Sequence, residues 1–176
     1  IRRLRFPGPA YTGTMVMAAV RESLRFGATH MLTVSPEFVP DSHELEKLIE
    51  AIHQYPDAIL IGTDTAPTSL RYRNVLARLA FRVQTGISLE TPQCDLRVYP
   101  LDCLNHLTLR LKGQAFLMEV LVKAAWAGID IHQVAVKTDS LPHAARAPEK
   151  GGFFSWLGSL LLNLHWIMRS ITPIPH

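Results

Sequence analysis

The hydrophobic positions of this chain switch repeatedly between helical and extended spacing. A short strand is indicated at residues 3–6, apolar residues then recur at helical intervals over 14–26, and a β-rich run follows at 30–34. A second helix is indicated from Ser42, which we expect to be its N-cap, and "DAILIGTD" from Asp57 is typical of a buried strand. Alternation of strands and helices predicts a parallel sheet with helices on its faces.

The alternation continues in the second half of the chain. Residues 72–84 read as a basic amphipathic helix, and 94–107 as a strand that turns into a short helix. A further helix over 116–127 is closed by Gly128, and "IDIHQVAV" gives one more strand. We therefore predict one α/β domain over residues 1–140.

The composition changes beyond this domain. Residues 141–152 are rich in Pro, Ala, Gly and charge, which is typical of a linker. Residues 153–176 are far more apolar and carry no fixed charge from Phe153 to Met168, so we expect an apolar or amphipathic C-terminal helix. Such a helix either rests on a membrane surface or packs on its own domain or on a second copy, and the pattern leaves these partners open.

Composition and charge exclude several classes of function. The 176 residues are 48% apolar, which is enough for one buried core. Cys94 and Cys103 lack the paired spacing of a zinc site or a disulfide framework, so free thiols in a reducing compartment are expected. The net charge of +3 comes from scattered Arg, which argues against nucleic-acid binding. We expect a cytoplasmic protein, held peripherally at the membrane if the C-terminal helix binds there.

Several segments, read in order, resemble the catalytic domain of family two glycosyltransferases, in particular the dolichyl- and polyprenyl-phosphate sugar transferases. They are "GPAYTGTMVMAAV", "HMLTVSPEFVPDS", "DAILIGTD", "QCDLRVYPLD", "FLMEVLVKAAWAG" and "IDIHQVAVKT". The resemblance implies a Rossmann-like, mostly parallel sheet that binds a nucleotide-sugar donor through Mg²⁺ or Mn²⁺ and passes the sugar to an acceptor with inversion. It also implies that the first nucleotide-binding strands would precede Ile1.

The resemblance places a metal-binding turn after the strand at 30–34. Where the family has Asp-x-Asp, this chain has Ser35, Pro36 and Glu37. Glu37 is thereby implied as a metal ligand and Ser35 as a substrate contact. One carboxylate and a hydroxyl are a weaker set of hard oxygen ligands than two Asp. The alternative is a solvated carboxylate on a turn.

The resemblance also implies a diphosphate site in "GPAYTGT". The main-chain amides at Thr12 and Gly13 would meet a phosphate at a helix N-terminus. Thr12 stands where the family often has a Lys, so the cation is missing. A plain turn into a helix is the alternative.

Two further positions concern the acceptor. The family's general base falls on Leu117, which cannot take a proton, and Glu119 is the acidic candidate nearby. Glu119 is equally expected as a structural partner of a nearby Arg. Arg97, in a segment resembling a conserved loop of the family, is implied to orient that loop or contact a phosphate, and a salt bridge with Asp95 or Asp102 is the alternative.

The altered metal, phosphate and base positions together predict a glycosyltransferase-like protein whose catalytic power is weakened or lost. If it is active, it requires a nucleotide-sugar donor and a divalent metal. The alternative is a non-catalytic interaction module that keeps the fold, because function resides in the site rather than in the fold.

Overall fold

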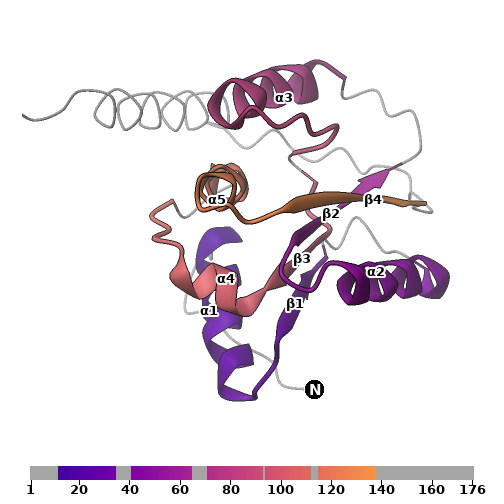
Figure 1. Cartoon of the computed structure of the whole chain (residues 1–176), viewed down its shortest axis with the longest axis vertical. Helices are drawn as coiled ribbons and strands as arrows, with labels where there is room; N and C mark the ends of the chain where they lie inside the picture. Colours follow the sequence, from indigo (N-terminus) through magenta and orange to yellow (C-terminus); the bar gives the residue numbers. More distant parts are fainter. Residues whose placement is uncertain (1–11, 35–40, 65–70, 93, 112–114, 138–176) are drawn as a thin grey trace, which may run out of the picture. The chain divides into compact units, whose positions relative to one another are not determined.

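The structure, a computed structural model, describes residues 12–34, 41–64, 71–92, 94–111 and 115–137 (Figure 1). Its elements, in chain order, are α1 (Thr12–Arg25), β1 (His30–Thr33), α2 (Ser42–Gln54), β2 (Ile59–Asp64), α3 (Arg71–Thr85), β3 (Arg97–Pro100), α4 (Leu101–His106), α5 (Ala115–Trp126) and β4 (Ile131–Val136). The predicted strand at 3–6, the linker at 141–152 and the C-terminal helix at 153–176 lie outside the described residues.

The predicted helices and strands that fall on described residues are all present. α5 ends where Gly128 was expected to close it, and α1 ends just before Gly27; these glycines have φ of 75° and 69°, in the left-handed region that favours glycine. The predicted N-cap of α2 is wrong by one residue. Asp41 caps this helix, because its side chain accepts the amide of Glu44 at 2.9 Å, and Ser42 is already the first helical residue.

The prediction of a mostly parallel sheet needs correction, because the sheet is mixed. The strand order is β1-β3-β2-β4, and β3 runs antiparallel to both of its neighbours. The parallel pairing is that of β2 with β4. β1, β2 and β4 still point the same way, so β3 is a reversed strand inserted between two strands of common direction.

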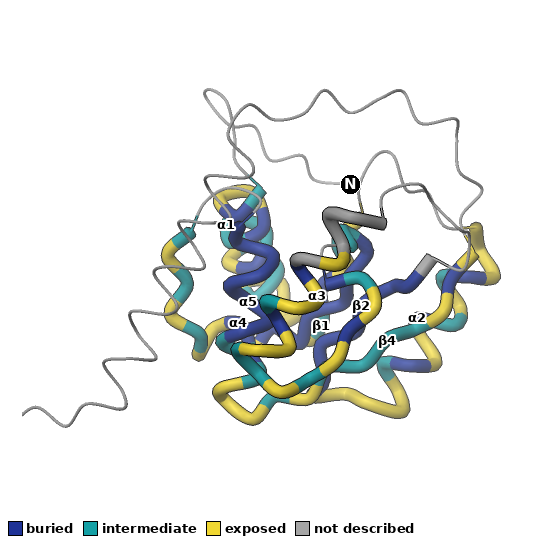
Figure 2. Tube along the Cα trace, turned by 90° about the horizontal axis from the view of Figure 1, so that it is seen from above, coloured by how far each residue is buried: buried dark blue, intermediate teal, exposed yellow. Residues whose placement is uncertain are grey.

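Side chains alternate between the two faces of the sheet and build two cores. Ile59, Ile61 and Tyr99 point into the core on the side of α1, α4 and α5. Leu60 and Val98 point into the smaller core beneath α2. The two central strands, β3 and β2, are therefore covered on both faces, as Figure 2 shows by the dark colour of β2.

α5 is the central helix of the larger core. Its residues from Ala115 to Val122 are buried, which is unusual for a helix at the surface of a domain and typical of one packed on several sides. α1, α3 and β4 all contact it. This placement decides the geometry of the candidate site.

Candidate functional site

The candidate site begins at the edge of the sheet where three strands end. β1, β2 and β4 share a direction, so their carboxyl ends lie at one edge, where α/β proteins commonly bind ligands. β3 runs the other way and therefore begins at this edge, with Arg97 paired to Thr33 of β1 and Ile61 of β2. Ser35 and Glu37 lie outside the described residues.

Arg97 is buried and holds three main-chain carbonyls. Its side chain is fully excluded from solvent. The guanidinium donates from Nε to Cys94 O at 2.6 Å, from Nη1 to Leu117 O at 2.7 Å and from Nη2 to Pro92 O at 2.7 Å. These contacts fix Pro92 and Cys94 to α5, and all three acceptors are carbonyl oxygens. The contact of Arg97 with a phosphate stays a prediction.

Tyr99 lies two residues along the same strand, on the same face as Arg97. Its hydroxyl is buried and has no hydrogen-bond partner among the described residues. Burial raises the pKa of the Tyr99 phenol, and the positive charge of Arg97 acts in the opposite direction. Tyr99 is therefore neutral at physiological pH and acts as part of the core.

Gly13 packs at the start of α1 against the segment before α5. A Cβ atom built on Gly13 would lie 2.7 Å from Phe116 Cγ and 2.8 Å from the carbonyl oxygen of Leu111. Only a glycine at this position allows the two segments of the chain to approach this closely. The close approach gives Gly13 a packing role in addition to the predicted phosphate contact, which stays a prediction. Thr12, beside it, is half-buried.

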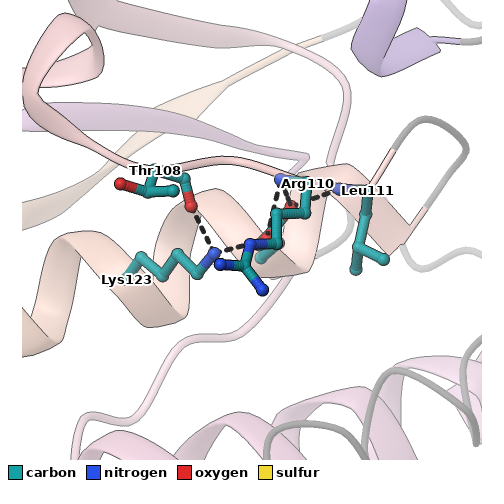
Figure 3. A network of polar contacts seen from close by, with 5 residues as sticks. Thr108, Arg110, Leu111 and Lys123 are labelled. Carbon is teal, nitrogen blue, oxygen red and sulfur yellow. Dashed lines mark hydrogen bonds and ion pairs between the residues drawn. The ribbon is translucent and has the colours of Figure 1, made fainter.

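Glu119 anchors the segment 108–111 to α5 (Figure 3). Only 4% of Glu119 is exposed. Its carboxylate accepts the amide of Arg110 at 3.0 and 3.1 Å, the amide of Leu111 at 2.8 Å and the ammonium of Lys123 at 2.5 Å. Lys123 also donates to the carbonyl of Thr108. We call this group the Glu119 clamp.

In the clamp, Glu119 has a structural role, which was one of the two alternatives that the sequence left open. Its partners differ from the predicted one. The expected partner was an Arg side chain, whereas the contacts are two main-chain amides and Lys123. The spacing of Glu119 and Lys123 is that of a favourable helix pair at i and i+4, which was the available signal for Lys123. The partner amides come from an irregular segment that no periodicity reveals. The role of Glu119 as a base stays a prediction.

Three of the predicted site residues converge on the first turns of α5. Gly13 packs against Phe116, Arg97 binds the carbonyl of Leu117, and Glu119 follows two residues later. Leu117 itself is buried in the core. The sequence thus singled out residues that share one structural centre.

Two open hollows lie away from this edge. One, of about 310 Å³, lies at the amino ends of β2 and β4, where the rings of Tyr55 and His132 stack with centroids 3.9 Å apart. Cys103 lines it, and burial raises the pKa of its thiol. The other, of about 370 Å³, lies along α2 and β4. Their lining shares no residue with the predicted donor site.

The described residues also bear on metal binding and on membrane spanning. Within the described ranges, no group of three or more His, Cys, Asp and Glu side chains is arranged to hold a metal ion. Glu37, the predicted metal ligand, lies outside these ranges. No helix in the described part of the chain has both the length and the apolar character needed to cross a bilayer.

No family model and no curated protein matches the chain. Solved structures do match. The chain is similar to glucosyl-3-phosphoglycerate synthase from Mycobacterium tuberculosis in complex with phosphoglyceric acid, with a TM-score of 0.65 and 15% identity over 90% of this chain and 56% of that one. A complex of the same enzyme with Mn²⁺, UDP-glucose and phosphoglyceric acid gives a TM-score of 0.64, 15% identity and coverage of 91% and 57%.

The chain has a glycosyltransferase-like fold. This confirms the coarse prediction of an α/β fold of the nucleotide-sugar transferase kind. The similarity extends over nine-tenths of this chain. The chain spans a little over half the length of the enzyme that it matches, at 56%.

Proposed function

We propose that this protein is a glycosyltransferase of the family two type, which transfers a sugar from a nucleotide-sugar donor to an acceptor. The observation that carries the proposal is the glycosyltransferase-like fold, since one of the matching structures is a complex with Mn²⁺ and UDP-glucose. A second support is the convergence of Gly13, Arg97 and Glu119 on α5. A lipid-linked acceptor at a membrane surface is the finer part of the proposal and rests on the sequence resemblance alone.

Each predicted residue has a role in this proposal. The amides of Thr12 and Gly13 receive a phosphate of the donor at the start of α1. Ser35 and Glu37 provide oxygen ligands, Glu37 to the divalent metal. Arg97 is a positioning residue, because its three hydrogen bonds to carbonyls fix Pro92 and Cys94 against α5.

Glu119 has two proposed roles, as a general base and as a clamp. The carboxylate cannot perform both at the same time. As a base, it takes the proton of the acceptor hydroxyl while the acceptor oxygen bonds to the anomeric carbon. The bond from that carbon to the diphosphate breaks, and the nucleoside diphosphate leaves with the electron pair. As a clamp, it keeps the contacts described above and takes no proton. The four hydrogen bonds of the carboxylate favour the clamp.

A titration with nucleotide-sugars tests the proposal. UDP-glucose and GDP-mannose are added to the protein with and without Mn²⁺, and the heat of binding is measured by calorimetry. We expect saturable binding that requires Mn²⁺ and is lost in Glu37→Gln. Glu46→Gln is the matched control, because Glu46 is exposed on α2 and should leave binding unchanged.

The opposite result identifies the alternative function. Absence of binding to any nucleotide-sugar, in a protein that unfolds cooperatively, would indicate a non-catalytic interaction module with the transferase fold. Where binding occurs, release of nucleoside diphosphate in the presence of an acceptor measures turnover. Glu119→Gln then separates the two roles, because loss of turnover at unchanged donor affinity indicates a base and unchanged turnover indicates a clamp.

A further inference from the structure

The helix α3 has one buried face and one face of exposed apolar side chains. Ala77 and Phe81 are buried and lie on the side that packs against α5. Val75, Leu79 and Val83 are 53%, 57% and 76% exposed. Residues four apart lie on one side of a helix, so these three form a continuous apolar stripe opposite the buried pair.

Two arginines accompany this stripe. Arg78 and Arg82 are exposed and follow Val75 by three and seven residues, which places them on the same side of α3. Neither forms an ion pair with a described residue, and α3 contains no Asp or Glu over Arg71–Thr85. We call Val75, Arg78, Leu79, Arg82 and Val83 the outer face of α3. It is apolar and cationic.

A tryptophan of α5 contacts the last turn of α3. Trp126, at the end of α5, is 45% exposed, and its indole Nε1 donates to the carbonyl of Gln84 at 2.9 Å. This hydrogen bond joins the ends of the two helices and is not part of the outer face.

Three partners could cover the outer face: a second copy of the chain, the apolar C-terminal segment or an anionic lipid surface. The charge of the face favours one of them. A second copy of α3 would bring arginines against arginines with no acidic residue to separate them, which is repulsive. The apolar segment from Phe153 to Met168 carries no acidic residue, so it would leave Arg78 and Arg82 unmatched. An anionic lipid surface satisfies both the apolar stripe and the arginines.

We propose that the outer face of α3 lies on an anionic membrane surface. The apolar side chains enter the boundary of headgroups and acyl chains, and the two guanidinium groups bind lipid phosphates and carboxylates. This contact needs neither a nucleotide-sugar nor the C-terminal segment. It is therefore independent of the proposed transferase activity, and one can fail without the other.

Flotation of the full chain with vesicles tests the proposal. Vesicles of phosphatidylcholine alone are compared with vesicles that contain about 30% phosphatidylserine. We expect binding to the anionic vesicles only, with a loss when NaCl is raised from about 0.05 to about 0.5 M. The double variant Arg78→Gln/Arg82→Gln should bind about 30-fold more weakly, from the usual contribution of two basic residues near such a surface.

The apolar part of the face is tested separately. Leu79→Ser/Val83→Ser should weaken binding at least about 10-fold, since it removes buried apolar area from the interface. Ile49→Ser is the matched control, because Ile49 is similarly exposed, at 54%, on α2. Arg25→Gln is the control for charge, since Arg25 is exposed on α1. Both should bind as the parent chain does.

Three results would overturn the proposal. One is equal binding of the parent chain and the double Arg variant, and another is binding that is abolished only by substitutions in 153–168, such as Trp156→Asp/Trp166→Asp. The third is a concentration-dependent dimer, seen by sedimentation and lost in Leu79→Ser/Val83→Ser, which would assign the face to a second copy. Urea unfolding is measured for each variant and for the parent chain. A cooperative transition like that of the parent shows that the fold of the variant is intact.

Discussion

The Nη1 atom of Arg97 lies 2.7 Å from the carbonyl oxygen of Leu117, so a charged side chain fastens the reversed strand β3 to the central helix α5. The charge is excluded from solvent and faces three carbonyl dipoles. A buried cation of this kind is tolerated because its donors are satisfied. The contact joins the sheet edge to the helix on which Gly13 and Glu119 also converge.

Replacing Arg97 should destabilise the protein strongly. Arg97→Met leaves three buried carbonyls without donors, and we expect the free energy of unfolding to fall by roughly 3 kcal/mol or more. Arg97→Lys keeps the charge but loses the planar fork of donors, so it should rescue only part of the loss. Urea denaturation measures both. Arg25→Met, on the exposed side of α1, should change stability by less than about 0.5 kcal/mol; a similar value for Arg97→Met would contradict the structure.

Gly13→Ala should be costly although it adds a single methyl group. The new Cβ would lie 2.7 Å from Phe116 Cγ and 2.8 Å from the Leu111 carbonyl, and the carbonyl belongs to the main chain. We expect a loss of about 1–3 kcal/mol in the free energy of unfolding. Thr14→Ala is the control, because Thr14 is exposed in the same turn of α1. Equal thermal midpoints for the two variants would show that α1 does not approach α5 this closely.

Removing the Glu119 carboxylate should release the segment that precedes α5. Glu119→Ala leaves the amides of Arg110 and Leu111 without their acceptor, so both should exchange with solvent much faster. We expect a loss of about 2–4 kcal/mol in stability, since buried donors to a charged group lose their partner. Hydrogen exchange followed by mass spectrometry measures the effect. Glu50→Ala, exposed on α2, should leave the exchange of residues 108–111 unchanged.

Glu44 gives stability a dependence on acidic pH. The hydrogen bond from Lys47 is the main cause that lowers the pKa of the Glu44 carboxyl below 4.5 in the folded protein. Its contribution is therefore present above the unfolded pKa and is lost as pH falls through the folded value. The difference in stability between the parent chain and Glu44→Gln should be constant near neutrality and shrink below about pH 4.5.

Urea titrations across this range measure the difference. Glu46→Gln serves for comparison, because the Glu46 side chain is 73% exposed in the same helix. A Glu44→Gln difference that grows on acidification would reverse the sign and exclude the Lys47 contact as its cause.

The sequence predicted the elements of the fold better than their arrangement. Hydrophobic periodicity and closing glycines located α1 and α5, because those signals are local. The direction of β3 could not be found in this way, since a strand of four buried residues reads the same in either direction. Its reversal depends on pairing with β1 and β2, which are remote in sequence.

The candidate site shows the same difference between local signals, which the sequence contains, and tertiary contacts, which it does not reveal. The sequence singled out Arg97 and Glu119, and as structural alternatives to their proposed roles it offered an acidic partner for Arg97 and an Arg for Glu119. Buried side chains of this kind are satisfied largely by main-chain groups, whose positions depend on the tertiary fold. The carbonyls of Pro92 and Leu117 and the amides of Arg110 and Leu111 carry no signal in their side chains.

The position of β3 also sets the order in which this sheet can close on the ribosome. Among the described strands, β1 pairs only with β3, and Thr33 and Arg97 are separated by 64 residues. Among the described strands, β1 and β2 therefore have no partner until β3 has left the exit tunnel, and their edges stay open to chaperones or to other nascent chains until then. A domain of this kind should acquire its sheet late in synthesis and fold slowly, because its pairings are remote.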